Sequence, residues 1–385
     1  MTREWPGAEG ISTDGPMGRA HWDVPGHRRS GLRLLHRLNR YGLVLRSPSV
    51  RPLAEDTEPG IATLPGIAQC LDDPAFVGVI ALKGDAIRLE AYARDFHARH
   101  VHSIQSISKM LVNLLAARCL GLGLIDLQRR TADYLPGIGG GYAGASVQQL
   151  LDMNVANGYV EDYTDPGSDV GRLECVHGWR IDTGNRGPAL RDYLVSIGGH
   201  ARPSEQGEIQ YKTANTDIAA WICERVARQA LRESLLELIE QAGMAHAVYV
   251  STDRDGVPFL GGGLHMTLRD LARLGRLFCF DSPDGASQHG LVREALANPD
   301  AGTRYGDGTG YRNFLETDGR FVGHLGYGGQ YLYVEPANSI VVAAFNATEG
   351  DDGLDHEFIV RQRGACRRIA RAIDGTSQDD AAVGQ

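Results

Sequence analysis

Apolar and polar positions divide the chain into three parts with different patterns. The first part carries two apolar runs, Phe76 to Leu82 and Ile87 to Tyr92, on either side of Gly84-Asp85. Short apolar runs that flank a glycine turn are typical of paired strands. The pattern therefore predicts a β-hairpin early in the chain.

The middle of the chain has the 3.6-residue spacing of helices. Ser146 is followed three positions later by Gln149 and then by apolar residues, which predicts a helix start with a capping box. The longer helical patterns run over Ile107 to Leu120, Asn215 to Ala230, Leu231 to Ala242 and Thr267 to Phe278.

The last third returns to strands before a final helix. Strands are expected over Arg320 to Gly323, Gln330 to Val334 and Ile340 to Phe345, and an amphipathic helix over Leu354 to Ile373. The simplest arrangement is an α+β fold, in which the two ends of the chain share an antiparallel sheet flanked by helices and the middle forms a mainly helical lobe. A site is expected in the cleft between them.

The expected organisation has four parts. Residues 1–30 form an irregular arm, and residues 376–385 form a flexible tail. Residues 31–130 and 290–375 form the sheet lobe, and residues 131–289 form the helical lobe.

Composition narrows the class of protein. The 385 residues are 42% hydrophobic and 23% charged, which is ordinary for a globular enzyme, and the net charge of -9 argues against a nucleic-acid binder. No apolar run is long enough for a membrane helix, and residues 1–26 lack the apolar core of a signal peptide. We therefore expect a cytoplasmic protein with no membrane partner, and the sequence leaves self-association open.

Cysteine and lysine usage adds two points. The six cysteines have no C-x-x-C pair and no histidine at ligand spacing, so we expect reduced thiols, no metal and no cofactor. Lys83, Lys109 and Lys212 are the only lysines, whereas arginine is abundant. Since arginine does not lose its proton, a lysine in this chain indicates a place where a titratable amine is wanted.

The first candidate for chemistry is Ser106-x-x-Lys109 at the start of the first long helix. Residues three apart share a helical face, so the Lys109 amine can reach the Ser106 hydroxyl. A serine needs a base to become a nucleophile, and burial lowers the pKa of a lysine enough to make it one. The same four residues also fit a helix start without any chemistry.

Two further motifs follow in the sequence. Tyr211-Lys212-Thr213 precedes a helix, where Tyr211 is either a packed aromatic or a phenol that relays a proton to a leaving group. Gly323 to Gln330 is either an edge strand with a glycine turn or a strand whose backbone lines the cleft and supplies an oxyanion donor.

In this order and spacing, the three motifs resemble the serine β-lactamase, penicillin-binding protein and esterase superfamily. The resemblance covers about residues 70 to 375 and is nearest to the class C and esterase branch. Tyr211, with Asn215 and Asp217 behind it, is similar to the tyrosine motif of the 6-aminohexanoate-dimer hydrolases. His324-Leu325-Gly326 stands where β-lactamases carry Lys-Thr-Gly.

The resemblance implies the β-lactamase/transpeptidase-like fold and an acyl-enzyme on Ser106, with Lys109 and Tyr211 transferring its proton. It also implies an oxyanion hole made by the backbone N–H groups of Ser106 and Tyr327. The loop from Tyr159 to Asp165 is expected to border the acyl pocket. The expected substrate contacts are His324, Gly326, Asn215, Tyr159 and His265, although His265 fits an ordinary core histidine equally well.

One departure from the β-lactamase pattern shapes the expected function. His324 replaces the lysine that would hold a β-lactam carboxylate, so β-lactam hydrolysis is not expected. The leading hypothesis is a serine hydrolase of small-molecule esters or amides. The alternatives are an acyltransferase with the same acyl-enzyme, and a ligand sensor without catalysis, which the retention of Lys109 and Tyr211 disfavours.

Overall fold

The computed structural model describes residues 18–181, 187–204, 207–282 and 288–375. Most of the expected arm (residues 1–17) and the expected tail (residues 376–385) lie outside them. No helix among the described residues is long and apolar enough to cross a membrane.

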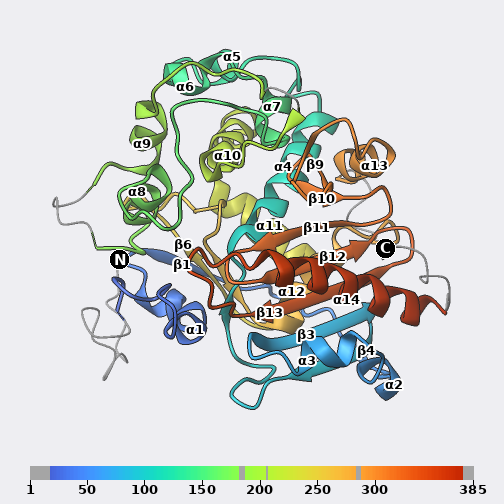
Figure 1. Cartoon of the computed structure of the whole chain (residues 1–385). Coiled ribbons are helices and arrows are strands. Elements are labelled where there is room, and N and C mark those ends of the chain that lie inside the picture. Colours follow the sequence, from blue (N-terminus) through green and yellow to red (C-terminus); the bar gives the residue numbers. More distant parts are fainter. Residues whose placement is uncertain (1–17, 182–186, 205–206, 283–287, 376–385) are drawn as a thin grey trace.

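A nine-stranded sheet forms the base of the fold (Figure 1). Its neighbouring strands are antiparallel except β2 and β4, which are parallel. In spatial order the strands are β2 (Ala54–Glu55), β4 (Ala86–Tyr92), β3 (Phe76–Lys83), β13 (Ile340–Asn346), β12 (Gln330–Glu335), β11 (Val322–Gly326), β10 (Leu315–Thr317), β9 (Gly310–Arg312) and β8 (Thr303–Arg304).

A second, four-stranded sheet packs against α1 (Arg28–Leu38) and the 3₁₀-helix η1 (Gln105–Ser108). The segment that precedes Ser106 forms one of its edges. Its order is β1 (Gly42–Leu45), β6 (Val248–Ser251), β7 (Leu264–Met266) and β5 (His102–Ser103).

Helices cover both faces of the large sheet and build the remaining part of the molecule (Figure 1). They are α1 (Arg28–Leu38), α2 (Pro59–Ala62), α3 (Ile67–Leu71), the 3₁₀-helix η1 (Gln105–Ser108), α4 (Lys109–Gly121), α5 (Thr131–Tyr134), α6 (Gly140–Ala143), α7 (Val147–Leu151), α8 (Asp169–Val176), α9 (Leu190–Ser196), α10 (Thr213–Ala227), α11 (Leu231–Ala242), α12 (Leu268–Arg276), α13 (Gly290–Ala297) and α14 (His356–Asp374).

The central strands β3 and β13 are apolar except at their last residues because helices bury both of their faces. On one face α14 packs on β3, β12 and β13, while α3 packs on β3 and α2 packs on β4. On the other face α12 packs on the same three strands and α4 reaches β11. The expected α+β fold, an antiparallel sheet built from both ends of the chain and flanked by helices, is confirmed.

The predicted helices agree closely with the observed ones. Ser146 caps α7 as expected, accepting from the Gln149 amide while the Gln149 side chain accepts from the Ser146 amide. The sequence pattern predicts fewer strands than the structure contains. The described residues after 300 form six strands, where about three were expected. The additional strands β8, β9 and β10 have two or three residues each, too few to give a two-residue periodicity.

α12 belongs to the sheet layer although it lies in the segment assigned to the helical lobe. Gly275 on this helix permits the close approach. A Cβ there would lie 2.5 Å from Val341 Cγ1 and 3.1 Å from Leu332 Cδ1. The helix is therefore seated directly on β12 and β13.

We expect Gly275→Ala to destabilise the protein by about 1–2 kcal/mol, because overpacking outweighs the gain in helix propensity. Gly60→Ala in α2 is the matched control, since a Cβ at Gly60 meets nothing within 4 Å. Denaturant unfolding measures both. Equal free energies of unfolding for the two variants would contradict the prediction that the contact of α12 with β12 and β13 leaves no room for a Cβ at position 275.

Candidate active site

Ser106 and Lys109 meet where β5 turns through η1 into α4. Ser106 lies in η1 and Lys109 is the first residue of α4. The Lys109 Nζ atom lies 2.9 Å from Ser106 Oγ. The structure therefore brings together the two side chains that the helical spacing predicts to be neighbours.

The residue before Ser106 has an unusual backbone conformation. Gln105 adopts φ of 51°, in the left-handed region that side chains with a Cβ rarely occupy. Its amide group donates to Ser103 Oγ over 2.8 Å. Such a conformation costs of order 1–3 kcal/mol and persists where the surroundings require it. Here the left-handed conformation of Gln105 directly precedes Ser106, which lies at the cavity wall.

The Lys109 amine is buried and held by three oxygen atoms. Besides Ser106 Oγ, it donates to the Gly261 carbonyl over 2.5 Å and to Thr213 Oγ1 over 3.3 Å. Burial lowers the pKa of Lys109 to about 8, against the opposing pull of the Glu161 and Asp217 carboxylates. A larger fraction of this amine is therefore neutral near pH 7 than for an exposed lysine.

Tyr211, just before α10, lies next to both Ser106 and Lys109. Lys109 Nζ is 5.0 Å from the centroid of its ring. Burial raises the pKa of Tyr211 well above its usual value, and a hydrogen bond with Ser106 acts in the opposite direction. The phenol thus keeps its proton at neutral pH and is placed to exchange it with Ser106.

The glycine-rich motif forms a hairpin turn at the cavity. Gly326 pairs with Gln330, and the turn between them uses Gly328 and Gly329 at φ of 79° and 88°. A Cβ on Gly326 would lie 2.6 Å from the Ile104 carbonyl, so β11 reaches η1 only because this residue is glycine. Gly326 and Tyr327 both line the cavity that Ser106 opens into.

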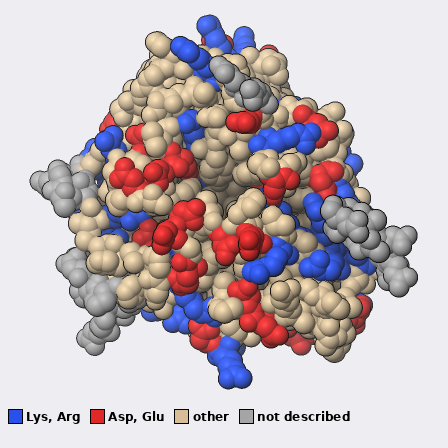
Figure 2. Space-filling view, viewed as in Figure 1, with Lys and Arg blue, Asp and Glu red and all other residues tan. Residues whose placement is uncertain are grey.

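This cavity has a volume of about 480 Å³, which suits a small molecule. Figure 2 shows a hollow near the middle of this face with acidic side chains beside it. Three of the lining residues are acidic and none of the described ones is lysine or arginine. The lining residues are Ser106, Glu161, Asp162, Tyr163, Thr164, Ile209, Tyr211, Tyr305, Leu325, Gly326, Tyr327, Asp352 and Leu354.

Glu161 is a site residue that the sequence did not single out. It accepts hydrogen bonds from the Thr213 amide over 2.8 Å, and from Thr213 Oγ1 and the Tyr163 hydroxyl over 2.6 Å each. The sequence placed the loop from Tyr159 to Asp165 beside the pocket, but no motif distinguishes Glu161 within it. Its position follows from a contact with α10, 52 residues away.

Asp217 completes the charged groups around Lys109. Its Oδ1 accepts from the Gly261 amide over 3.2 Å, and the Gly261 carbonyl accepts from Lys109. Burial raises the pKa of Asp217 to about 7, and the Lys109 charge opposes this rise. Asp217 was expected behind Tyr211, and the structure connects it to Lys109 through the backbone N–H and carbonyl of Gly261.

Four of the expected substrate contacts do not line the cavity. His324 lies behind Tyr211, with its ring nitrogens 3.0 Å from the Tyr311 hydroxyl and 2.6 Å from the Leu325 carbonyl. Burial lowers the pKa of His324 to about 3, so the ring is neutral.

The other three are also buried. Asn215 faces Met153 Sδ at 3.5 Å, the carbonyl of Tyr159 accepts from Lys212, and His265 lies 3.2 Å from Ser251 Oγ. Gly326 is thus the expected contact that does border the cavity, and substrate contact by the other four stays a prediction. Within the described ranges, no group of three or more His, Cys, Asp or Glu side chains is placed to hold a metal ion.

The titration of Lys109 gives a prediction for the reactivity of Ser106. Because Lys109 accepts a proton only when neutral, the rate at which a fluorophosphonate labels Ser106 should rise with pH through about 8. Glu161→Gln removes a charge that raises the pKa of Lys109, so the midpoint should move to lower pH. Glu240→Gln, an exposed carboxylate on α11, is the control and should leave it in place. An unchanged midpoint in Glu161→Gln would contradict this electrostatic coupling.

Comparisons with known proteins identify the family of the chain. The model of the beta-lactamase family matches residues 60–363. A 6-aminohexanoate-dimer hydrolase of Paenarthrobacter ureafaciens is 29% identical over 326 residues, which are 81% of this chain and 82% of that protein.

Two solved structures extend the comparison to the fold. A candidate 6-aminohexanoate-dimer hydrolase from Bacillus anthracis has a TM-score of 0.78 at 18% identity, covering 94% of this chain and 98% of that one. EstCE1, a hydrolase with promiscuous acyltransferase activity, has a TM-score of 0.55 at 16% identity, covering 80% and 96%. The chain belongs to the beta-lactamase family and is a serine hydrolase.

Proposed function

We propose that this protein hydrolyses small-molecule esters or amides through an acyl-enzyme on Ser106. The observation that carries the proposal is the 2.9 Å contact between Ser106 Oγ and the buried amine of Lys109, at the wall of a cavity of about 480 Å³. The relative from Paenarthrobacter ureafaciens, a 6-aminohexanoate-dimer hydrolase, supports a linear amide as one substrate type.

In the first step Ser106 Oγ attacks the substrate carbonyl carbon. Neutral Lys109 takes the hydroxyl proton, and because burial lowers its pKa, more molecules carry the neutral amine at pH 7 than with an exposed lysine. The carbonyl oxygen becomes negative and accepts hydrogen bonds from the Ser106 and Tyr327 amides, each worth about 10²–10³ in rate. Tyr211 donates its proton to the leaving alcohol or amine and recovers one from Lys109.

In the second step water attacks the acyl-enzyme. Lys109, neutral again after the first step, accepts the proton of the water as its oxygen bonds to the carbonyl carbon. The bond between the carbonyl carbon and Ser106 Oγ then breaks, and Lys109 returns the proton to Ser106 Oγ. The released acid leaves through the cavity mouth. An alcohol or amine that replaces water in this step would give acyl transfer, which the fold neighbour EstCE1 performs.

The test is intact-protein mass spectrometry after exposure to p-nitrophenyl butyrate and to a fluorophosphonate. We expect one adduct on the wild type and on Ser108→Ala, and none on Ser106→Ala. Ser108 is the matched control because it is a second buried serine in the same motif, and its hydroxyl accepts from the Leu264 amide. Equal labelling of Ser106→Ala would remove Ser106 from the mechanism, and an ester product formed with added alcohol would identify acyl transfer.

The charge of the cavity predicts a substrate preference. Because Glu161, Asp162 and Asp352 line it and His324 is neutral, p-nitrophenyl esters whose acyl chain ends in a carboxylate should react with about tenfold lower kcat/KM than neutral ones of equal length. The difference should shrink at high salt and in Asp352→Asn. Asp192→Asn, exposed on α9, should not change it. Equal kcat/KM values for the two esters at low salt would contradict the prediction.

A further inference from the structure

The segment from Gly18 to Leu38 precedes the region that matches the family, yet it packs against the turn that carries Tyr327. Trp22 and Arg28 are 1% and 0% exposed. A buried arginine is costly unless the surrounding groups satisfy it. The contacts of Arg28 therefore need an explanation.

Arg28 is held by backbone carbonyls. Its Nε donates to the Asp23 carbonyl over 3.0 Å, and one terminal nitrogen donates to the carbonyls of Thr348 and Gly350 over 2.6 and 2.7 Å. The guanidinium carbon lies 5.1 Å from the centroid of the Tyr327 ring. In the described part of the chain no carboxylate forms an ion pair with Arg28, so carbonyls and an aromatic face surround its charge. Its second terminal nitrogen is buried and has no hydrogen-bond partner among the described residues.

The carbonyls that bind Arg28 belong to the segment that holds the turn. The Thr348 amide donates to the Gly328 carbonyl, and the Gly328 amide donates to the Gly353 carbonyl, over 3.0 Å each. A Cβ on Gly353 would lie 2.2 Å from Tyr327 Cε2, so the backbone of this segment touches the Tyr327 ring. Arg28 thus fixes both the ring of Tyr327 and the peptide that follows it.

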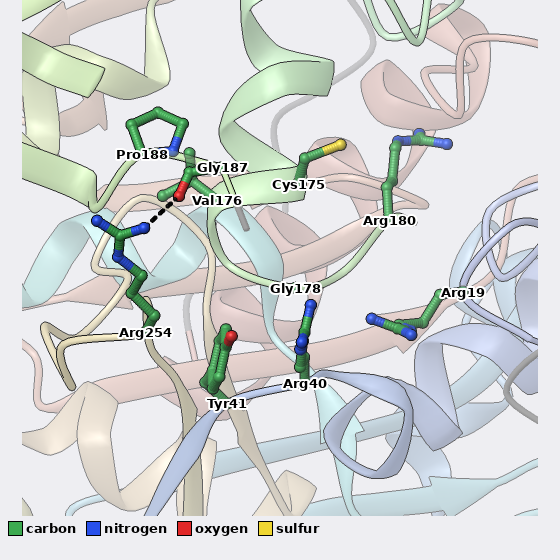
Figure 3. Close-up of a pocket in the computed structure, with 10 residues that line it drawn as sticks. All are labelled: Arg19, Arg40, Tyr41, Cys175, Val176, Gly178, Arg180, Gly187, Pro188 and Arg254. Atoms are coloured by element: carbon green, nitrogen blue, oxygen red, sulfur yellow. Dashed lines mark hydrogen bonds between the residues drawn. The ribbon is translucent and has the colours of Figure 1, made fainter. Parts of the chain in front are cut away.

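The N-terminal segment is anchored independently on the helical side. Asp23 forms an ion pair with Arg180, which also pairs with Glu174. Trp22 packs edge-on against Trp179 at 5.5 Å and Tyr327 at 6.1 Å. Arg180 borders a small pocket of about 20 Å³, room for about one water, that also contacts Arg19 (Figure 3). The segment therefore spans from the end of α8 to the hairpin of β11 and β12.

We propose that Arg28 is a positioning residue for the oxyanion hole: it holds the turn so that the Tyr327 amide points at the developing oxyanion. The inference rests on the proposed function, in which that amide is one of the two donors. Misplacement of an oxyanion donor by a fraction of an ångström weakens the transition-state contact while leaving substrate binding nearly unchanged.

The experiment compares Arg28→Met, which keeps an unbranched apolar stem without the guanidinium, Arg28→Lys, which keeps the charge, and Arg29→Met as control. Arg29 is the next residue of the same helix, and it binds Asp95 and the Phe76 carbonyl instead of the turn. We expect Arg28→Met to lower the acylation rate constant with p-nitrophenyl butyrate by about 10- to 100-fold with KM within about twofold. The acylation rate constant of Arg28→Lys should lie between those of the wild type and Arg28→Met, and that of Arg29→Met should equal the wild-type value.

A second readout separates positioning from stability. Affinity for a boronic acid, which forms a tetrahedral adduct, should fall in Arg28→Met by the same factor as the acylation rate constant, while affinity for the product acid stays unchanged. Thermal unfolding of each variant shows whether it is folded, and if Arg28→Met is not, Arg28→Lys carries the test.

The outcomes distinguish the two proposals. If the wild type forms an acyl-enzyme on Ser106 and folded Arg28 variants acylate at the wild-type rate, the positioning role is wrong and the proposed function stands. Equal losses in Arg28→Met and Arg29→Met would also overturn it, since these would reflect the anchoring of α1 alone. If Ser106→Ala labels like the wild type, the proposed function itself fails.

Discussion

The structure depends on one buried amine, that of Lys109. Taking an ammonium out of water is unfavourable, so the site must either satisfy the charge or let the proton leave. Ser106 Oγ, Thr213 Oγ1 and the Gly261 carbonyl satisfy it, and each comes from a different part of the chain. η1 with α4, the start of α10 and the segment before β7 must therefore all be in place before this amine has its partners.

Two carboxylates, those of Glu161 and Asp217, oppose the lowering of the Lys109 pKa by burial. Burial lowers the pKa of Lys109, while Glu161 and Asp217 raise it, and neither carboxylate forms an ion pair with it in the described structure. Glu161 instead accepts three hydrogen bonds from Thr213 and Tyr163, and Asp217 accepts from the Gly261 amide. The carboxylates thus act on Lys109 through space and leave its lone pair free to face Ser106 when the proton is lost.

The contacts that the sequence predicts correctly join residues close together in the chain, and the contacts that it misses join residues far apart in the chain. Ser106 and Lys109 are three residues apart, and the capping box of α7 spans three residues, so helical geometry alone places them. Glu161 meets Thr213 over 52 residues and Arg28 meets Thr348 over 320, and no periodicity encodes such contacts. The motif around His324 located β11 correctly, but strand alternation turns His324 away from the cavity that Leu325 lines.

The positions of lysine and arginine in this protein follow from how burial affects the charge of each side chain. Of 39 basic residues three are lysines. Lys83 forms a partly exposed pair with Asp374, whereas Lys109 and Lys212 are buried and burial lowers the pKa of each. Arg28 is equally buried, but a guanidinium stays charged and offers a planar set of donors, so it suits a fixed contact with backbone carbonyls. A lysine at that position has one compact ammonium group in place of the planar guanidinium, so it would hold the turn less firmly. An arginine in place of Lys109 could never accept the proton of Ser106.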